Sequence, residues 1–180
     1  MGVKFTRISG GFLLAISLML LMLPLPWLLS AVAAAAFHEL CHYLAIRICC
    51  GKGTELSIRM QGARMTLPPM SQGREAVCAL AGPIGGLSLL LFARWIPRIA
   101  LCAGFQSCFN LLPVYPLDGG RALQSLLSLV CSPPMCQIIC STAAVLCRVG
   151  ICGLALYGTF WLHLGIFPIL LAASLLLRAK

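Results

Sequence analysis

Two of the four acidic residues in this chain lie inside apolar stretches that are long enough to sit in a lipid bilayer. Glu39 follows an alanine-rich run, and Asp118 lies between a proline-containing segment and a glycine pair. An ionisable side chain at membrane depth is energetically costly, so it is a functional-site hypothesis by default. These two carboxylates favour a fold in which membrane helices surround a polar site.

The composition also favours a membrane protein. The 180 residues are 61% apolar and only 9% charged, which argues against a soluble globular domain. Since a transmembrane helix needs roughly 20 apolar residues, the length allows about six spans with short loops. The basic residues behind the net charge of +9 lie between apolar segments, as positive-inside topology requires. No basic tract is interleaved with aromatic residues, so we expect no nucleic-acid partner.

We predict an all-α polytopic membrane protein of about six transmembrane helices, forming a single domain over residues 1–180. The predicted spans cover residues 8–25, 27–49, 75–95, 135–158 and 161–177, with a fourth span that starts near residue 99. The eleven cysteines lie mostly inside these apolar runs and are expected to act as small hydrophobes, not as disulfides.

The fourth span cannot be a regular helix throughout. It meets Pro113, Pro116 and the pair Gly119-Gly120, and such residues interrupt helices. Irregular backbone at membrane depth is tolerated only where protein buries it or where it lines a wet cavity. We therefore expect Asp118 in an irregular stretch beside a polar cavity.

Residues 54–67 have a different period. Leu56, Ile58 and Met60 alternate with polar residues, and the alternation resumes after Gly62. This pattern around a glycine turn predicts a small β-hairpin between spans two and three, with an irregular surface loop as the alternative.

The distribution of charge predicts the topology. Basic residues precede the first span, follow the second and end the chain, whereas the loops after spans one and five are uncharged. We expect both termini in the cytoplasm. This topology places the residues around His42 and Asp118 in the cytoplasmic half of the membrane.

The second span carries the motif His38-Glu39-Leu40-Cys41-His42. Histidines four residues apart lie on one helix face and can bind one metal ion, and Glu39 can reach a water at that metal as general base. A catalytic zinc takes three protein ligands, and Asp118 is the natural third. This constellation predicts an intramembrane zinc metalloprotease with one Zn²⁺ per chain.

These residues resemble the site-2 protease family of intramembrane metalloproteases. The resemblance rests on His38-Glu39-Leu40-Cys41-His42 and on the segment from Asn110 to Arg121, and it covers a catalytic core of about residues 28–128. It implies that His38, His42 and Asp118 bind zinc, that Glu39 is the catalytic base and that Asn110 helps to hold substrate or the oxyanion.

The sequence departs from the family pattern at two positions. Gly86 stands where the family often has asparagine, so one polar contributor to the site is missing, and Cys41 replaces the usual glycine of the motif. We expect no PDZ or CBS domain.

The compact layout and the Asp118 motif look most like the stage IV sporulation subgroup, which processes a transcription-factor precursor. The resemblance implies a multi-pass protein of a bacterial cell membrane with a protein substrate in or at that membrane. A regulatory membrane partner is a further expectation. The edge of the hairpin at Leu56, Ile58 and Met60 is expected to bind an extended substrate strand.

Two other functions compete with a protease. A metal-ion transporter would string ligands along a path, often in repeated halves, whereas this chain has one compact cluster and no repeat. A catalytically inactive membrane scaffold would not need His38, Glu39, His42 and Asp118 together.

Overall fold

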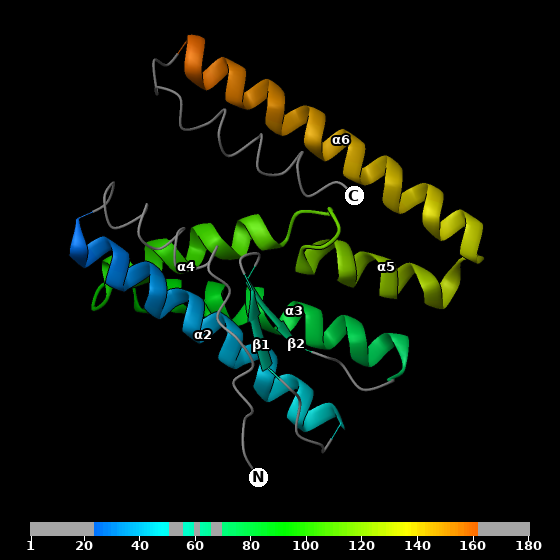
Figure 1. Cartoon of the computed structure of the whole chain (residues 1–180), viewed down its shortest axis with the longest axis horizontal. Coiled ribbons are helices and arrows are strands. Elements are labelled where there is room, and N and C mark those ends of the chain that lie inside the picture. The colour runs from blue at the N-terminus through cyan, green and yellow to red at the C-terminus, as the bar shows by residue number, and fades with distance from the viewer. Residues whose placement is uncertain (1–23, 51–55, 60–61, 66–69, 162–180) are drawn as a thin grey trace. The chain divides into compact units, whose positions relative to one another are not determined.

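The computed structural model describes residues 24–50, 56–59, 62–65 and 70–161 (Figure 1). These residues form mainly helices, and the chain divides into two compact units, Met1–Phe109 and Asn110–Lys180. Three helices are long and apolar enough to cross a membrane: Leu25–Cys50, Gln72–Phe92 and Pro133–Phe160. The described residues thus have the character of a membrane protein. The predicted first and sixth spans lie almost wholly outside them, and the count of six spans stays a prediction.

In the first unit, α2 (Leu25–Cys50) corresponds to the predicted second span. Pro26 is its second residue, a position where the missing N–H costs no helical hydrogen bond. Helix α2 packs against α3 (Gln72–Ser88), which continues as the 3-10 helix η1 (Leu89–Phe92). Helix α4 (Pro97–Asn110) then ends this part of the chain.

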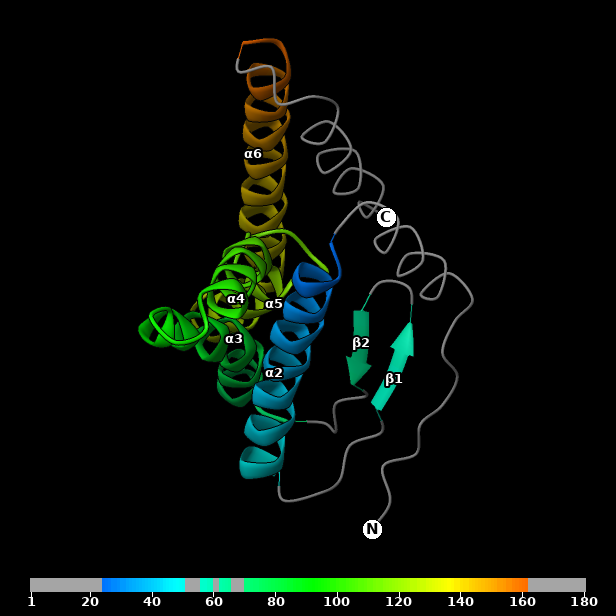
Figure 2. The ribbon, with the colours of Figure 1, turned by 90° about the vertical axis from the view of Figure 1, so that its left-hand side faces the viewer.

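Two short strands, β1 (Leu56–Arg59) and β2 (Gly62–Met65), pair in antiparallel fashion inside the segment predicted as a hairpin (Figure 2). Ile58 lies opposite Ala63, and Arg59 lies opposite Gly62. Gly62, the glycine of the predicted turn, is the first paired residue of β2. Met60 lies outside the described residues.

In the second unit, α5 (Asp118–Val130) is joined through Cys131 and Ser132 to α6 (Pro133–Phe160), and the two helices pack against each other. Helix α6 extends the predicted fifth span at both ends. Pro133 and Pro134 occupy its first turn, where proline is tolerated.

The prediction that Asp118 lies in irregular backbone was wrong. The irregular stretch covers residues 111–117, and Asp118 is the first residue of α5. Gly119 and Gly120 are helical, and the preceding loop passes close to both. A Cβ atom at Gly119 would overlap the carbonyl group of Leu111, and one at Gly120 would overlap backbone atoms of Val114 and Tyr115. Glycine here permits close backbone approach and does not interrupt the helix.

Candidate metal centre

His38 and His42 lie one turn apart on α2 and are both buried. Their imidazole rings meet edge to face, with centroids 4.7 Å apart and an interplanar angle of 79°. The two Nε2 atoms are 3.1 Å apart. Two Zn–N bonds of 2.0–2.1 Å at a tetrahedral angle would place the nitrogens about 3.3 Å apart. The pair therefore fits two ligands of one tetrahedral ion with little rearrangement.

Helix α3 fixes the orientation of His42. The Nδ1 atom of His42 lies 2.7 Å from the carbonyl oxygen of Cys78, which has no proton to donate, so Nδ1–H is the donor. In the neutral ring the proton on Nδ1 leaves a lone pair on Nε2, the nitrogen that faces His38. A backbone carbonyl in this position is the usual outer partner of a metal-binding histidine.

Small residues on α3 make room for this arrangement. A Cβ atom at Gly82 would overlap the imidazole ring of His42, and a Cβ atom at Gly85 would overlap Sγ of Cys41. The ring of His42 thus lies directly against the backbone of α3. Cys41 is accommodated because its neighbour on α3 is a glycine, as expected for membrane helices that approach closely at small residues.

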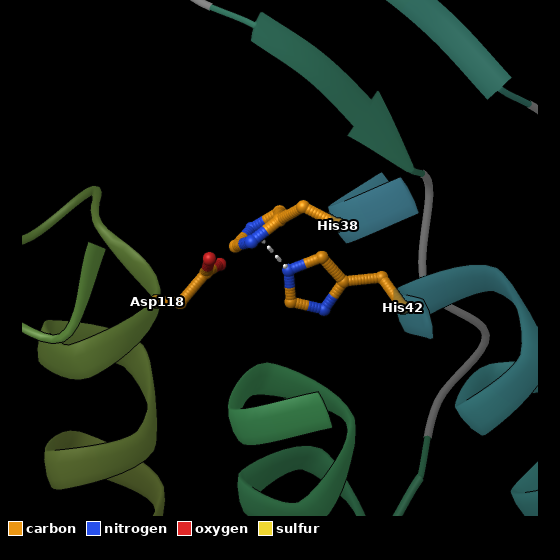
Figure 3. Close-up of side chains that lie close together, drawn as sticks. All are labelled: His38, His42 and Asp118. Carbon is orange, nitrogen blue, oxygen red and sulfur yellow. Dashed lines mark hydrogen bonds between the residues drawn. The ribbon is translucent and has the colours of Figure 1, made fainter. Parts of the chain in front are cut away.

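Asp118 is half-buried at the start of α5. A carboxylate is favourable at that position, because the N-terminus of a helix carries partial positive charge. His38, His42 and Asp118 each offer one ligand atom, and these atoms lie within 4.8 Å of one another (Figure 3). A group of this kind could hold a metal ion, and two imidazoles with one carboxylate form a donor set suited to zinc.

Glu39 and Asn110, the other predicted residues of the catalytic site, lie on different helices. Glu39 follows His38 on α2 and is half-buried, and Asn110 is the last residue of α4 and also half-buried. Their roles as base and as oxyanion or substrate contact stay predictions. Gly86 faces the hydroxyl of Ser107, which a Cβ at position 86 would overlap. An asparagine side chain would therefore not fit at position 86 without displacement of Ser107.

Sequence reasoning missed the carbonyl of Cys78 as a partner of His42. A backbone acceptor has no side-chain signature, so no residue type could have identified it. The nearest signal was the run Ala81-Gly82-Pro83-Ile84-Gly85-Gly86, which indicated a closely packed helix face but not what that face contacts.

No protein-family model and no curated protein matches the chain. Among solved structures, the chain is similar to the Site-2 Protease from Methanocaldococcus jannaschii, with 21% sequence identity and a TM-score of 0.65. The match covers 93% of this chain and 84% of that chain. At this identity the likeness establishes a shared fold, and the chain has the fold of a site-2 protease.

Proposed function

We propose that this chain is an intramembrane zinc metalloendopeptidase of the site-2 protease type. The observation that carries the proposal is the buried pair His38 and His42, whose Nε2 atoms lie 3.1 Å apart on an apolar helix. Two imidazoles at this distance in a membrane helix need a functional reason, because polar groups at that depth are costly. The shared fold with a site-2 protease supports the same function.

His38, His42 and Asp118 would hold the zinc. When bound, zinc would polarise the carbonyl of the scissile peptide and make a water molecule more acidic. Glu39 would accept a proton from the attacking water and deliver it to the departing amine nitrogen, as a general base and then a general acid. Asn110 would donate its amide hydrogens to the oxygen on which negative charge develops.

The substrate we propose is a membrane-inserted or membrane-associated proprotein, and a transcription-factor precursor is the finer hypothesis. A protease must bind its substrate as an extended strand. The membrane helices of the enzyme have no free backbone N–H and C=O groups for such a strand, because these groups are already paired within each helix. Among the described residues, β1 and β2 pair only with each other, so a substrate strand could add to the outer edge of either strand. The predicted topology would place cleavage towards the cytoplasmic side. The sporulation subgroup remains a hypothesis based on the Asp118 motif.

The test compares bound zinc and peptide cleavage in the full-length protein, purified in detergent and reconstituted in lipid. We expect about one zinc per wild-type chain, measured by elemental analysis, and cleavage of a membrane-inserted proprotein. Glu39→Gln should lower the cleavage rate by about 10²–10⁴-fold while zinc stays bound. His38→Ala is the matched control that should lose both.

Other results would reject the proposal. Zinc loss in Glu39→Gln equal to that in His38→Ala would mean that Glu39 is a ligand and not the base. Zinc transport across vesicles that depends on His38 would favour the transporter. If wild type and Glu39→Gln both bound one zinc per chain and cleaved at the same rate, Glu39 would not be the general base.

A further inference from the structure

A groove of about 590 Å³ lies between α5 and α6 in the second unit. Its lining residues recur every three or four positions along both helices, so each helix contributes one face. On α6 this face extends from Pro133 to Arg148, which is about 22 Å at 1.5 Å per residue. A groove of this length suits an extended or helical segment better than a small ion.

Arg148 stands at one end of the groove and is the only charged residue among the described residues that line it. Its Nε atom is buried and has no hydrogen-bond partner among the residues that the structure describes. The other polar lining groups are uncharged, and the hydroxyls of Ser128 and Ser141 already donate to backbone carbonyls of their own helices. Among the described lining residues no carboxylate faces Arg148, so an anion would complement the positive charge of the groove.

The depth of Arg148 in the membrane distinguishes two sources of such an anion, a lipid phosphate and a protein carboxylate. Arg148 lies about 22 Å from the first residue of α6 and about 18 Å from the last, so it is near the middle of a span. A lipid phosphate lies at the membrane surface, roughly 15 Å from the bilayer centre. A carboxylate carried by a membrane-inserted protein segment can reach this depth, and pairing would offset the cost of burying both charges.

We propose that the groove between α5 and α6 binds a membrane-inserted segment of another protein, and that Arg148 pairs with an aspartate or glutamate side chain of that segment. A guanidinium can donate two parallel hydrogen bonds to one carboxylate, which gives both strength and direction. The amide side chains of Gln124 and Gln137, which line the groove towards its other end, would contact polar groups of the same segment.

The experiment measures binding of two synthetic transmembrane peptides to the full-length protein in phosphatidylcholine bicelles by fluorescence transfer. Both peptides are leucine-alanine helices, one with a central glutamate and one with a central glutamine. Wild type should bind the glutamate peptide about 10-fold more tightly, as expected for hydrogen bonds to a charged group. Arg148→Gln should reduce this ratio to about one, and Arg148→Lys should retain part of it.

Arg98→Gln is the control, since it removes one positive charge from an exposed position outside the groove and should leave the ratio unchanged. Equal affinity of wild type for both peptides, or an unchanged preference in Arg148→Gln, would overturn the proposal. An Arg148-dependent gain in bound phosphatidylglycerol without peptide discrimination would identify a lipid as the occupant instead. A large Tm loss in Arg148→Gln without peptide would indicate an internal partner and also overturn it. Binding is read without cleavage, so these outcomes are separate from the proposed protease activity.

Discussion

The two units differ in how their helices surround a polar side chain. The contrast is between the pair α2 and α3 in the first unit and the pair α5 and α6 in the second. His42 on α2 is buried, and its Nδ1–H donates to a carbonyl oxygen of α3. Arg148 on α6 lines an open groove, and no hydrogen-bond partner reaches its Nε among the described residues. One pair of helices holds its polar group in a fixed orientation, whereas the other presents its polar group to a groove.

The packing of the two pairs explains the contrast. In an apolar stretch of 18 residues, the share of buried residues is 28% in α2 and 33% in Gln72–Phe92. In α6 the corresponding share is only 11%. Gly82 and Gly85 bring the backbone of α3 against α2, so no space remains between the two helices at His42. Within the part of the chain that the structure describes, nothing lies within 4 Å of a Cβ atom placed at Gly150 or Gly153 on α6. Close packing suits a metal site that needs exact geometry, and a loosely covered helix suits a docking surface.

The largest expected effect tests whether the first unit binds metal without a carboxylate. Asp118→Ala should reduce zinc affinity by more than the roughly 10–100-fold that loss of an outer-shell partner costs, because it removes a proposed ligand. Zinc titration against a competing chelator measures this. Asp118→Asn keeps the volume and is the matched control for packing. Unchanged zinc affinity in Asp118→Ala would mean that this carboxylate serves the local structure of α5, with Arg121 as the neighbouring charge.

The second prediction compares glycines of the two helix pairs. Gly82→Ala should lower zinc affinity by roughly 10–100-fold, because the added methyl group displaces the His42 ring and disturbs its hydrogen bond to Cys78. Gly150→Ala is the control in α6, where none of the described residues comes within 4 Å of the added methyl group. Alanine there should leave zinc unchanged and stabilise the helix by about 0.5–1 kcal/mol, measured by denaturant unfolding in micelles. Equal zinc affinity in the two variants would refute the role of α3 in holding the ring.

The sequence was sufficient to predict the elements whose signals are local. The apolar run and the histidine spacing predicted α2, and alternation predicted strands between residues 54 and 67. It was insufficient where two distant segments meet. Gly119 and Gly120 were expected to break a helix, yet they belong to α5. Their role is to let the preceding loop pack against the helix, and that contact is visible only in the structure.

The candidate site follows the same division. His38 and His42 could be paired from their spacing alone, whereas the carbonyl that orients His42 could not be predicted. Arg148 could have been found, since a single charge in the middle of an apolar helix is a signal in itself. Its significance depends on the groove, which requires the packing of α5 against α6.

The smallest expected effect tests whether the hairpin contributes to substrate cleavage independently of the groove between α5 and α6. Neighbouring residues in an antiparallel strand direct their N–H groups to opposite sides, so Ser57 and Ile58 serve different edges of β1. If a substrate strand adds at Ile58, Ile58→Pro should remove one hydrogen bond, worth about 0.5–1.5 kcal/mol, and slow cleavage up to about 10-fold. Zinc content and the peptide preference that depends on Arg148 should not change.

Ile58→Val is the matched control for this experiment, because it retains the N–H and the β-branched side chain and should cleave at the wild-type rate. Ser57→Pro tests the opposite edge of the same strand. A comparable loss in Ser57→Pro would indicate that an intact hairpin matters more than an open edge at Ile58. Normal turnover in Ile58→Pro would rule out strand addition there, and the substrate would then have to be held by the helices around the metal centre.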